Sequence, residues 1–349
     1  MQLWPFSKQF SSPWLPVGST ATSHSSSQLR VLSFNIRYAT SDPFTNEKPW
    51  AERFPLVLNQ LQHETRYLDG SHAARANLES MDDFTASLIC LQEVLHNQLI
   101  DILGGLNGLP PSKDGKEPPP DGPIWAHVGV GRDDGGIKGE YSPVLYPVNV
   151  FSLVHSETVW LSPTPEKPSI GWDAGSIRIL TVAVLEHKSS KRRVLASATH
   201  LDNEGSRSRE NSVTIILETL KRVHKQWSNN SKLPIVLAGD FNSFTDQEAY
   251  LGMAQSNFVY DLYNYVPPKR RYGEETTFTG FQPEKDKDEL GRIDFIWLGP
   301  TESVCEDAAE SSSQGLWKVD GYAVLPNVFD DGVYASDHRC VVGDARILY

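Results

Sequence analysis

The chain has 349 residues, of which 39% are hydrophobic and 22% charged, and its formal net charge at pH 7 is −12. This length accommodates one or two domains, and the composition is that of an ordinary globular protein. An acidic chain does not attract a nucleic-acid backbone unless a bound cation reverses the local field. The charge therefore argues against a general nucleic-acid-binding protein.

The cysteine content and the lack of long apolar runs bear on where the protein acts. There are three cysteines, and Cys90 and Cys340 lie within apolar runs, so we expect buried thiols rather than a disulfide framework or a zinc cluster. No apolar run reaches membrane-spanning length, and no apolar stretch follows a basic start at the N-terminus. We therefore expect a cytoplasmic protein without a signal peptide or a membrane span. The triplet Asn-Asn-Ser at 229–231, which matches the acceptor pattern for N-glycosylation, is then a chance match in a polar loop.

The chain begins with a segment rich in Ser, Thr and Pro, which strand-like and helix-like segments follow. Residues 1–28 show no periodicity and are expected to form a flexible tail, which leaves 29–349 as one folded domain. Short apolar runs predict strands at 30–38, 87–94, 124–131, 142–147, 151–161, 177–187, 193–201, 234–242, 292–298, 321–326 and 338–348. Helical spacing is found at 52–68, 95–103 and 206–226. The Pro-rich insert at 110–123 and the segment at 301–314 are expected to be surface loops.

Strands dominate this pattern, and helices are interspersed without strict alternation or any repeat of fixed period. The pattern favours an α/β fold, in which two packed, mostly antiparallel β-sheets are flanked by helices. We therefore expect a four-layer α/β sandwich.

Polar side chains recur where these apolar runs begin or end. Eight of them share this position: Asn35, Glu93, His200, Asp240, Asn242, Asp294, Asp337 and His338. Each alone has a plainer explanation, such as a turn, a helix start or a buried histidine. Together they indicate one site assembled from distant segments, because carboxylates beside buried strands need a cation or another partner to neutralise them.

The residue types in this set indicate their chemistry. Four of them carry the hard oxygen donors that Mg²⁺ or Mn²⁺ prefers over zinc: Glu93, Asp240, Asn242 and Asp337. His200 and His338 suit proton transfer and phosphate contact, and Asp294, between apolar neighbours, needs a partner such as a histidine. The chain has no HExxH, P-loop or GxSxG motif, which argues against zincins, nucleotide kinases and serine hydrolases.

A glycine-rich segment at 128–141 is interpreted as a flexible loop rather than a phosphate cradle. Within it, Arg132 is the side chain expected to reach an anionic substrate. Tyr141 is a candidate for the wall of a substrate pocket, as are Trp160 and Trp172. Core positions explain these aromatic residues equally well.

Six segments, in this order, resemble the endonuclease/exonuclease/phosphatase superfamily, which has the fold of deoxyribonuclease I: SFNIRY, LQEV, THLDN, GDFNS, GRIDFIW and SDHRCV. They cover nearly everything after the tail. Arg292-Ile293-Asp294 stands where inositol polyphosphate 5-phosphatases carry Cys-Asp-Arg, so that subfamily is disfavoured. The leucine-rich repeats of deadenylases and the basic loops of abasic-site nucleases are also lacking. The chain looks most like a microbial and fungal branch of the superfamily.

The resemblance implies a role for each residue of the set. Asn35, Glu93 and Asp337 would hold a Mg²⁺ or Mn²⁺ ion. Asp240 would orient or deprotonate the attacking water, and Asn242 would hold phosphate or metal. His338 would bind the scissile phosphate, with Asp294 fixing its tautomer. His200 would act on the leaving group or on oxygens of the transition state.

The function expected from these features is that of a monomeric, divalent-metal-dependent phosphoesterase whose domain at 29–349 is catalytic. We expect in-line attack by water on a small or medium organic phosphate or phosphodiester. A nuclease acting on DNA or RNA is the alternative, and it needs a basic rim, for which the candidates are Arg37, Arg132, Lys138, Arg207 and Arg209. A non-catalytic binding module is a third, weaker alternative.

Overall fold

The structure is a computed structural model that describes residues 26–66, 83–112, 115–228, 233–282, 290–301, 313–314 and 316–349. The expected tail lies outside the described residues up to position 25, and the first strand, β1, already begins at Ser26. The acceptor-like triplet at 229–231, Cys305 and most of the expected loop at 301–314 also lie outside the described residues.

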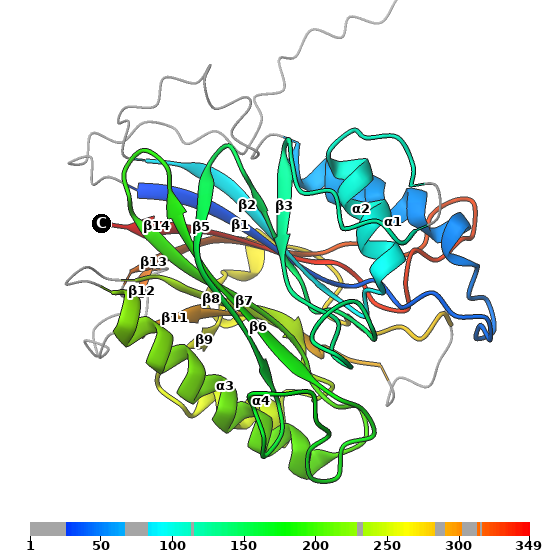
Figure 1. Cartoon of the computed structure of the whole chain (residues 1–349). Coiled ribbons are helices and arrows are strands. Elements are labelled where there is room, and N and C mark those ends of the chain that lie inside the picture. Colours follow the sequence, from blue (N-terminus) through cyan, green and yellow to red (C-terminus); the bar gives the residue numbers. More distant parts are fainter. Residues whose placement is uncertain are drawn as a thin grey trace, which may run out of the picture.

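Two β-sheets form the centre of the fold (Figure 1). The first has the strand order β10-β13-β14-β1-β2-β4-β3, with β12 paired to β13, and the second has the order β5-β6-β7-β8-β11-β9. The strands of the first sheet are β1 (Ser26–Asn35), β2 (Thr85–Gln92), β3 (Trp125–Val128), β4 (Val144–Pro147), β10 (Arg271–Gly273), β12 (Ser313–Gln314), β13 (Trp317–Val324) and β14 (Val341–Leu348). Those of the second are β5 (Phe151–Trp160), β6 (Ile179–His187), β7 (Arg193–His200), β8 (Ile235–Asp240), β9 (Tyr260–Asp261) and β11 (Asp294–Gly299). The pairs β1–β2, β7–β8 and β10–β13 are parallel and the other pairs are antiparallel.

Helices cover the outer face of each sheet, which makes four layers (Figure 1). They are α1 (Trp50–Thr65), α2 (His96–Leu106), α3 (Ser206–Trp227) and α4 (Glu248–Ala254), with two short 3₁₀ turns, η2 (Leu262–Tyr265) and η3 (Pro268–Arg270). Figure 1 shows α1 and α2 against the first sheet and α3 and α4 against the second. None of the helices within the described ranges combines the length and apolarity needed to span a bilayer.

Alternate side chains of the central strands enter different layers of the core. In β1, Val31 belongs to the cluster between the two sheets, whereas Leu32 belongs to the cluster under α1 and α2. In β8, Val236 likewise faces the other sheet and Leu237 faces α3 and α4. Because both faces of such strands are buried, apolar side chains occur at consecutive positions in their sequences.

This architecture confirms the predicted four-layer sandwich. The prediction was wrong about the last strand, which begins at Val341 rather than at His338. His338 instead lies in the turn before β14 and forms an isolated bridge with Phe278. The short elements α4, β9, β10 and β12 were not predicted from the sequence, because segments of two to seven residues carry too little periodicity.

The register of the sheets brings the predicted polar residues to one end of the sandwich. Asn35 pairs with Gln92 across the parallel strands β1 and β2, so Glu93 follows directly beside Asn35. In the second sheet Asp240 is the partner both of His200 on β7 and of Asp294 on β11. The strand ends of both sheets thus contribute to a single site.

Candidate active site

Asn35 lies at the centre of this site and joins the two sheets. Its Nδ2 donates to Glu93 Oε1 and to Asp240 Oδ2, both at 3.0 Å, and lies 3.4 Å from His338 Nε2. Its Oδ1 accepts a hydrogen bond from the backbone N–H of Arg37 at 3.0 Å. The side chain is therefore held from both ends, and it presents its nitrogen rather than its oxygen to the carboxylates.

His338 lies between two buried carboxylates. Its Nδ1 is 2.9 Å from Asp294 Oδ2, and its Nε2 is 3.5 Å from Asp240 Oδ2. Burial alone would lower the pKa of His338, but the charges of Asp294 and Asp240 outweigh burial and raise that pKa well above its usual range. His338 is therefore an imidazolium that can face an anion.

Asp240 is the carboxylate on which the site converges. Its Oδ1 accepts from the backbone N–H of Asn242 at 2.9 Å, and Asn242 has a left-handed backbone with φ of 45°. Burial and the nearby charge of Asp294 raise the pKa of Asp240 to about 7. A carboxylate with such a pKa can take a proton from water near neutral pH.

His200 is held beside Asp240 by an arginine that was not predicted from the sequence. Nη1 of Arg178 is 3.0 Å from His200 Nδ1, while His200 Nε2 lies 2.9 Å from Asn242 Nδ2 and 3.4 Å from Asp240 Oδ2. Burial and the positive charges of Arg178 and Arg132 lower the pKa of His200 well below its usual range. The two histidines of the site therefore differ, because His338 is charged and His200 is neutral.

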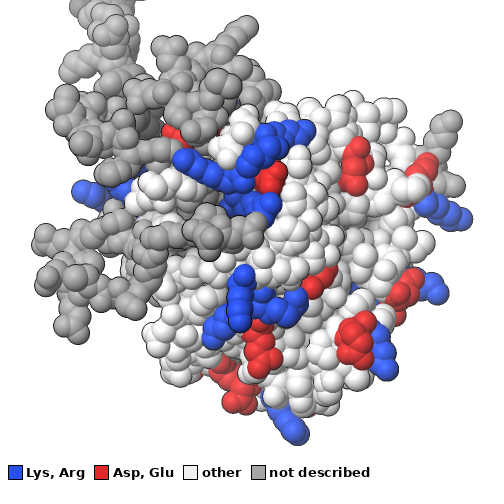
Figure 2. Space-filling view, turned by 60° about the vertical axis from the view of Figure 1, so that its left-hand side comes forward, with Lys and Arg blue, Asp and Glu red and all other residues white. Residues whose placement is uncertain are grey.

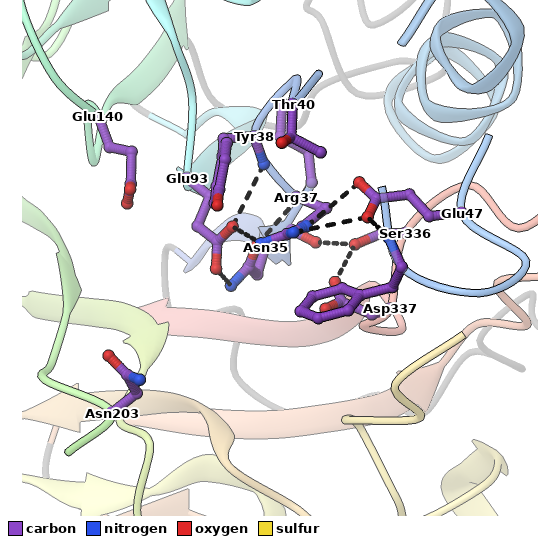
Figure 3. A network of polar contacts seen from close by, with 12 residues as sticks. Asn35, Arg37, Tyr38, Thr40, Glu47, Glu93, Glu140, Asn203, Ser336 and Asp337 are labelled. Atoms are coloured by element: carbon purple, nitrogen blue, oxygen red, sulfur yellow. Dashed lines mark hydrogen bonds and ion pairs between the residues drawn. The ribbon is translucent and has the colours of Figure 1, made fainter. Parts of the chain in front are cut away.

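Glu93 and Asp337 supply carboxylates on the side of the first sheet, where Figure 3 shows both in one polar network with Asn35 and Arg37. Burial would raise the pKa of Glu93, but the hydrogen bond from Asn35 and the charges of His338 and Arg37 lower it. Burial and the charge of Glu93 raise the pKa of Asp337. Glu93, like Arg37, has a left-handed backbone with φ of 57°, a strained conformation that is typical of functional sites.

The Arg37 side chain is fixed by partners that the sequence did not reveal. It binds Glu47 through Nε at 3.2 Å and Nη2 at 3.5 Å, and its Nη1 is 3.7 Å from Glu93 Oε2. Its guanidinium lies over the rings of Tyr38 and Phe44. Glu47 was missed because it lies in a polar loop of ordinary composition, and only its buried side chain in the structure reveals it.

The buried side chain of Arg53 ties this network to the turn that carries His338. Its Nη1 donates to the carbonyl oxygens of Ile36 at 2.8 Å and Ala335 at 2.9 Å, and its Nη2 donates to that of Arg37 at 3.0 Å. In the same turn, Ser336 Oγ donates to the carbonyl oxygen of Asn35 at 2.7 Å. Arg53 thus holds the loop after β1 against the turn before β14.

The two residues predicted to contact substrate lie in different surroundings. Arg132 donates from Nη1 to Glu140 Oε2 at 2.7 Å, and that oxygen is 3.8 Å from His200 Nδ1, so Arg132 borders the site. Burial and the charge of Glu93 raise the pKa of Glu140 to about 7. Tyr141 is buried in the core under α1 and α2, and its hydroxyl contacts Gly136 O at 2.9 Å and His96 Nδ1 at 3.0 Å. Its predicted role in substrate binding stays a prediction.

A divalent cation fits the donor set of this site. Asp240, Asp294 and His338 have ligand atoms within 4.8 Å of one another, so this buried group could hold a metal ion. The partly buried Glu93 and the buried Asp337 offer a second pair of carboxylates, and such oxygen donors suit Mg²⁺ or Mn²⁺.

A cavity of about 460 Å³ lies behind the turn that carries Asp337. Its lining includes Thr279, Asn327 and Arg339 but none of the predicted site residues. Thr279, in this lining, donates from Oγ1 to the carbonyl oxygen of Asp337 at 2.9 Å. The side chains that could carry out chemistry thus lie in the polar cluster and not in the lining of this cavity.

Comparison with known proteins bears on the fold and the family of the chain. No protein-family model and no curated protein sequence matches the chain. Solved structures do match. An endonuclease/exonuclease/phosphatase from Bacteroides vulgatus is 26% identical, with a TM-score of 0.69 over 92% of this chain and 99% of that one. A mannosyl-6-phosphatase from Bacteroides thetaiotaomicron is 26% identical, with a TM-score of 0.68 over 91% of this chain and 99% of that one.

A more distant match extends the likeness of the fold. TDP2 from D. rerio, solved with a single-stranded DNA product, is 16% identical, with a TM-score of 0.54 over 91% of this chain and 99% of that one. The shared sandwich, its near-complete coverage in both directions and the strand-end positions of the polar cluster agree with one another. The chain belongs to the endonuclease/exonuclease/phosphatase superfamily.

Proposed function

We propose that the protein is a divalent-metal-dependent phosphoesterase that hydrolyses the phosphate ester of a small or medium organic molecule. The observation that carries the proposal is the position of buried His338 between two carboxylates, with Nδ1 at 2.9 Å from Asp294 Oδ2 and Nε2 at 3.5 Å from Asp240 Oδ2. A fixed cation next to a base is what attack of water on an anionic phosphorus centre needs.

Each side chain then has a defined task. His338 donates to a non-bridging phosphate oxygen, and Asp294 keeps the ring oriented and charged. Asp240 accepts a proton from the attacking water, and the backbone N–H of Asn242 keeps its carboxylate in place. Asn35 lies between Asp240 and Glu93 and donates a hydrogen bond to each carboxylate at 3.0 Å, which keeps the two apart.

Glu93 and Asp337 are the residues that would hold the metal ion, with Asn35 beside them. When bound, such an ion neutralises negative charge on the phosphate and on its leaving group. Arg37 prepares this position, because it pairs with Glu93 and is itself anchored by Glu47. The carboxylate of Glu93 is thus held in position by Arg37.

A small substrate is favoured over nucleic acid by the pairing of the basic residues near the site. Of the five candidates for a basic rim, Arg37 pairs with Glu47, Arg132 with Glu140 and Arg209 with Glu248. Paired arginines add little field for a polyanion. On the face that Figure 2 shows, basic side chains stand in separate groups with acidic ones beside them.

Sugar phosphates are the first class to test, since a structural relative of 26% identity is a mannosyl-6-phosphatase. The assay compares hexose 6-phosphates, nucleoside monophosphates, a generic phosphodiester and supercoiled plasmid, with EDTA and with added Mg²⁺ or Mn²⁺. We expect metal-dependent release from one class of small ester and none from the plasmid at low salt. Cleavage of the plasmid alone would establish the nuclease alternative instead.

Two variants connect the activity to the site. His338→Gln and Asp240→Asn should each lower kcat by roughly a hundredfold or more, the range typical of lost general acid–base or electrostatic groups. His224→Gln is the matched control, because this histidine lies on α3 outside the cluster. If parent and both site variants behave alike on every substrate, the site does not carry the activity and the proposal fails.

A further inference from the structure

We propose that Arg178 is a positioning residue that selects the tautomer of His200, so that the Nε2 hydrogen of His200 points into the site. The use of this hydrogen in catalysis rests on the phosphoesterase function proposed above. The tautomer itself is a property of the resting protein and can be measured without any substrate.

Arg178 directly precedes β6 and contacts His200 and Asn203 at the end of β7. The residue is only 5% exposed, and each of its three guanidinium nitrogens has a partner. Nε donates to Asp202 Oδ2 at 3.3 Å, Nη2 donates to Asn203 Oδ1 at 2.8 Å, and Nη1 lies 3.0 Å from His200 Nδ1. A planar guanidinium with three such contacts has one orientation.

Asp202 anchors this arginine from a position that the backbone fixes. Its Oδ1 accepts from the N–H groups of Gly175 at 3.0 Å and Gly205 at 2.8 Å, and its Oδ2 accepts from that of Ser176 at 3.0 Å. These bonds join the loop before β6 to the turn after β7. Arg178 and His200 therefore keep their relative position as one unit.

The chemistry of the contacts determines where the ring hydrogen of His200 resides. A neutral imidazole has a single acceptor nitrogen, yet both ring nitrogens face N–H groups, from Arg178 at 3.0 Å and from Asn242 Nδ2 at 2.9 Å. A guanidinium has no acceptor and forms the stronger, charge-assisted bond. The Nδ2 group of Asn242 also donates to the carbonyl oxygen of Leu201 at 2.9 Å, so it has an acceptor without the lone pair of His200, and Nε2 has Asp240 Oδ2 as an acceptor at 3.4 Å. Arg178 therefore takes Nδ1 as the acceptor, and the hydrogen is left on Nε2.

This assignment decides whether His200 attracts or repels a phosphate oxygen. Nε2 lies 3.4 Å from Asp240 Oδ2, the same oxygen that Asn35 and His338 contact. With the hydrogen on Nε2, the ring donates to an oxygen of a phosphate ester bound there. With the opposite tautomer, a lone pair would face that oxygen. His200 thus acts as a neutral donor beside the charged His338.

The direct test is ¹⁵N NMR of protein labelled at histidine, at one pH in the absence of substrate, with His200→Asn to identify the His200 signals. We expect a protonated-type resonance for Nε2 and an unprotonated, acceptor-type resonance for Nδ1. A protonated Nδ1 in the parent protein would overturn the proposal without any variant being needed. Loss of activity on every ester, with the expected tautomer present, would count against the proposed function alone.

Variants separate a positioning role from a merely structural one. Arg178→Met should give mixed tautomers and lower kcat by roughly ten- to a hundredfold with little change in KM, as for other residues that orient a catalytic group. Arg178→Lys keeps a donor and should restore the Nε2 tautomer in part. Arg209→Met is the matched control, since Arg209 is equally buried and donates to the carbonyl oxygen of Asp202 without touching His200. If Arg209→Met shifts the His200 signals as Arg178→Met does, the tautomer is not set by Arg178.

Discussion

Asp240, the proposed base, should make the metal-free protein less stable as the pH rises. Its carboxyl has a pKa of about 7 in the fold, against an ordinary value of 3.8. Burial and the charge of Asp294 cause this rise. A raised carboxyl pKa means that the folded state binds more protons than the unfolded state between these two values, so stability falls as the pH rises through this window.

The size of the effect follows from the shift. Each unit of pKa difference corresponds to about 1.4 kcal/mol, so the shift of Asp240 removes about 3–4 kcal/mol of unfolding free energy between pH 4 and pH 8. Asp240→Asn keeps the shape of the side chain but cannot ionise. Relative to the parent, the variant should therefore gain about 3–4 kcal/mol over the same interval, whatever its baseline stability at pH 4.

Urea unfolding in EDTA at several pH values between 4 and 8 measures this difference directly. The quantity to compare is how the difference in unfolding free energy between variant and parent changes with pH. The contribution of lost hydrogen bonds does not depend on pH and cancels in this comparison. Asp246→Asn, at an exposed carboxyl, serves as the control. If the curves of parent and Asp240→Asn run parallel from pH 4 to pH 8, the carboxyl of Asp240 is not perturbed and its assignment as a base near neutral pH is wrong.

Three further predictions concern the surroundings of Asp240. Asp294→Asn removes a charge-assisted hydrogen bond to His338 worth about 1.5–3 kcal/mol, so kcat should fall about 10- to 150-fold. Because Asp294 then no longer raises the pKa of Asp240, the rise of kcat/KM with pH should also move to lower pH. Stopped assays over a pH series show both effects, and an unshifted profile contradicts the coupling. Arg53→Met leaves buried carbonyl oxygens without their donor and should lower the urea-unfolding free energy by about 3–5 kcal/mol, whereas Arg222→Met on the surface should change it by less than about 1 kcal/mol. Glu93→Gln should weaken Mn²⁺ binding in calorimetry at least tenfold, and equal affinity for parent and variant would place the ion elsewhere.

Much of the fold could be predicted because the central strands are buried on both faces. In β8 the apolar residues stand at consecutive positions, with Val236 and Leu237 facing different cores, and this pattern is a clear strand signal. The short strand β9 and the seven-residue helix α4 give no such signal, because their place depends on packing against β11 and α3. The start of β14 was predicted too early because Cys340 and its neighbours extend the apolar run toward His338.

The site could be predicted where a polar residue interrupts an apolar run. Asp240 and Asp294 stand out for this reason, and the register of β8 and β11 pairs them. Arg178, Glu140 and Glu47 were missed because charged residues in loops are ordinary, and their importance comes from partners far away in the sequence. An arginine inside the otherwise apolar run at 177–187 was the one signal that could have pointed to Arg178.

The bridge that Asn35 makes between the sheets has a practical consequence for dividing the chain. Asn35 and Glu93 precede the Pro-rich insert at 110–123, whereas Asp240, to which Asn35 donates at 3.0 Å, follows it. A cut in this insert yields two fragments, each with only part of the cluster, although β1 must pair with β14 and β2 with β4 to complete the first sheet. Phosphate release would then report the reassembly of the two fragments, which makes the insert a natural place to build a split-enzyme sensor.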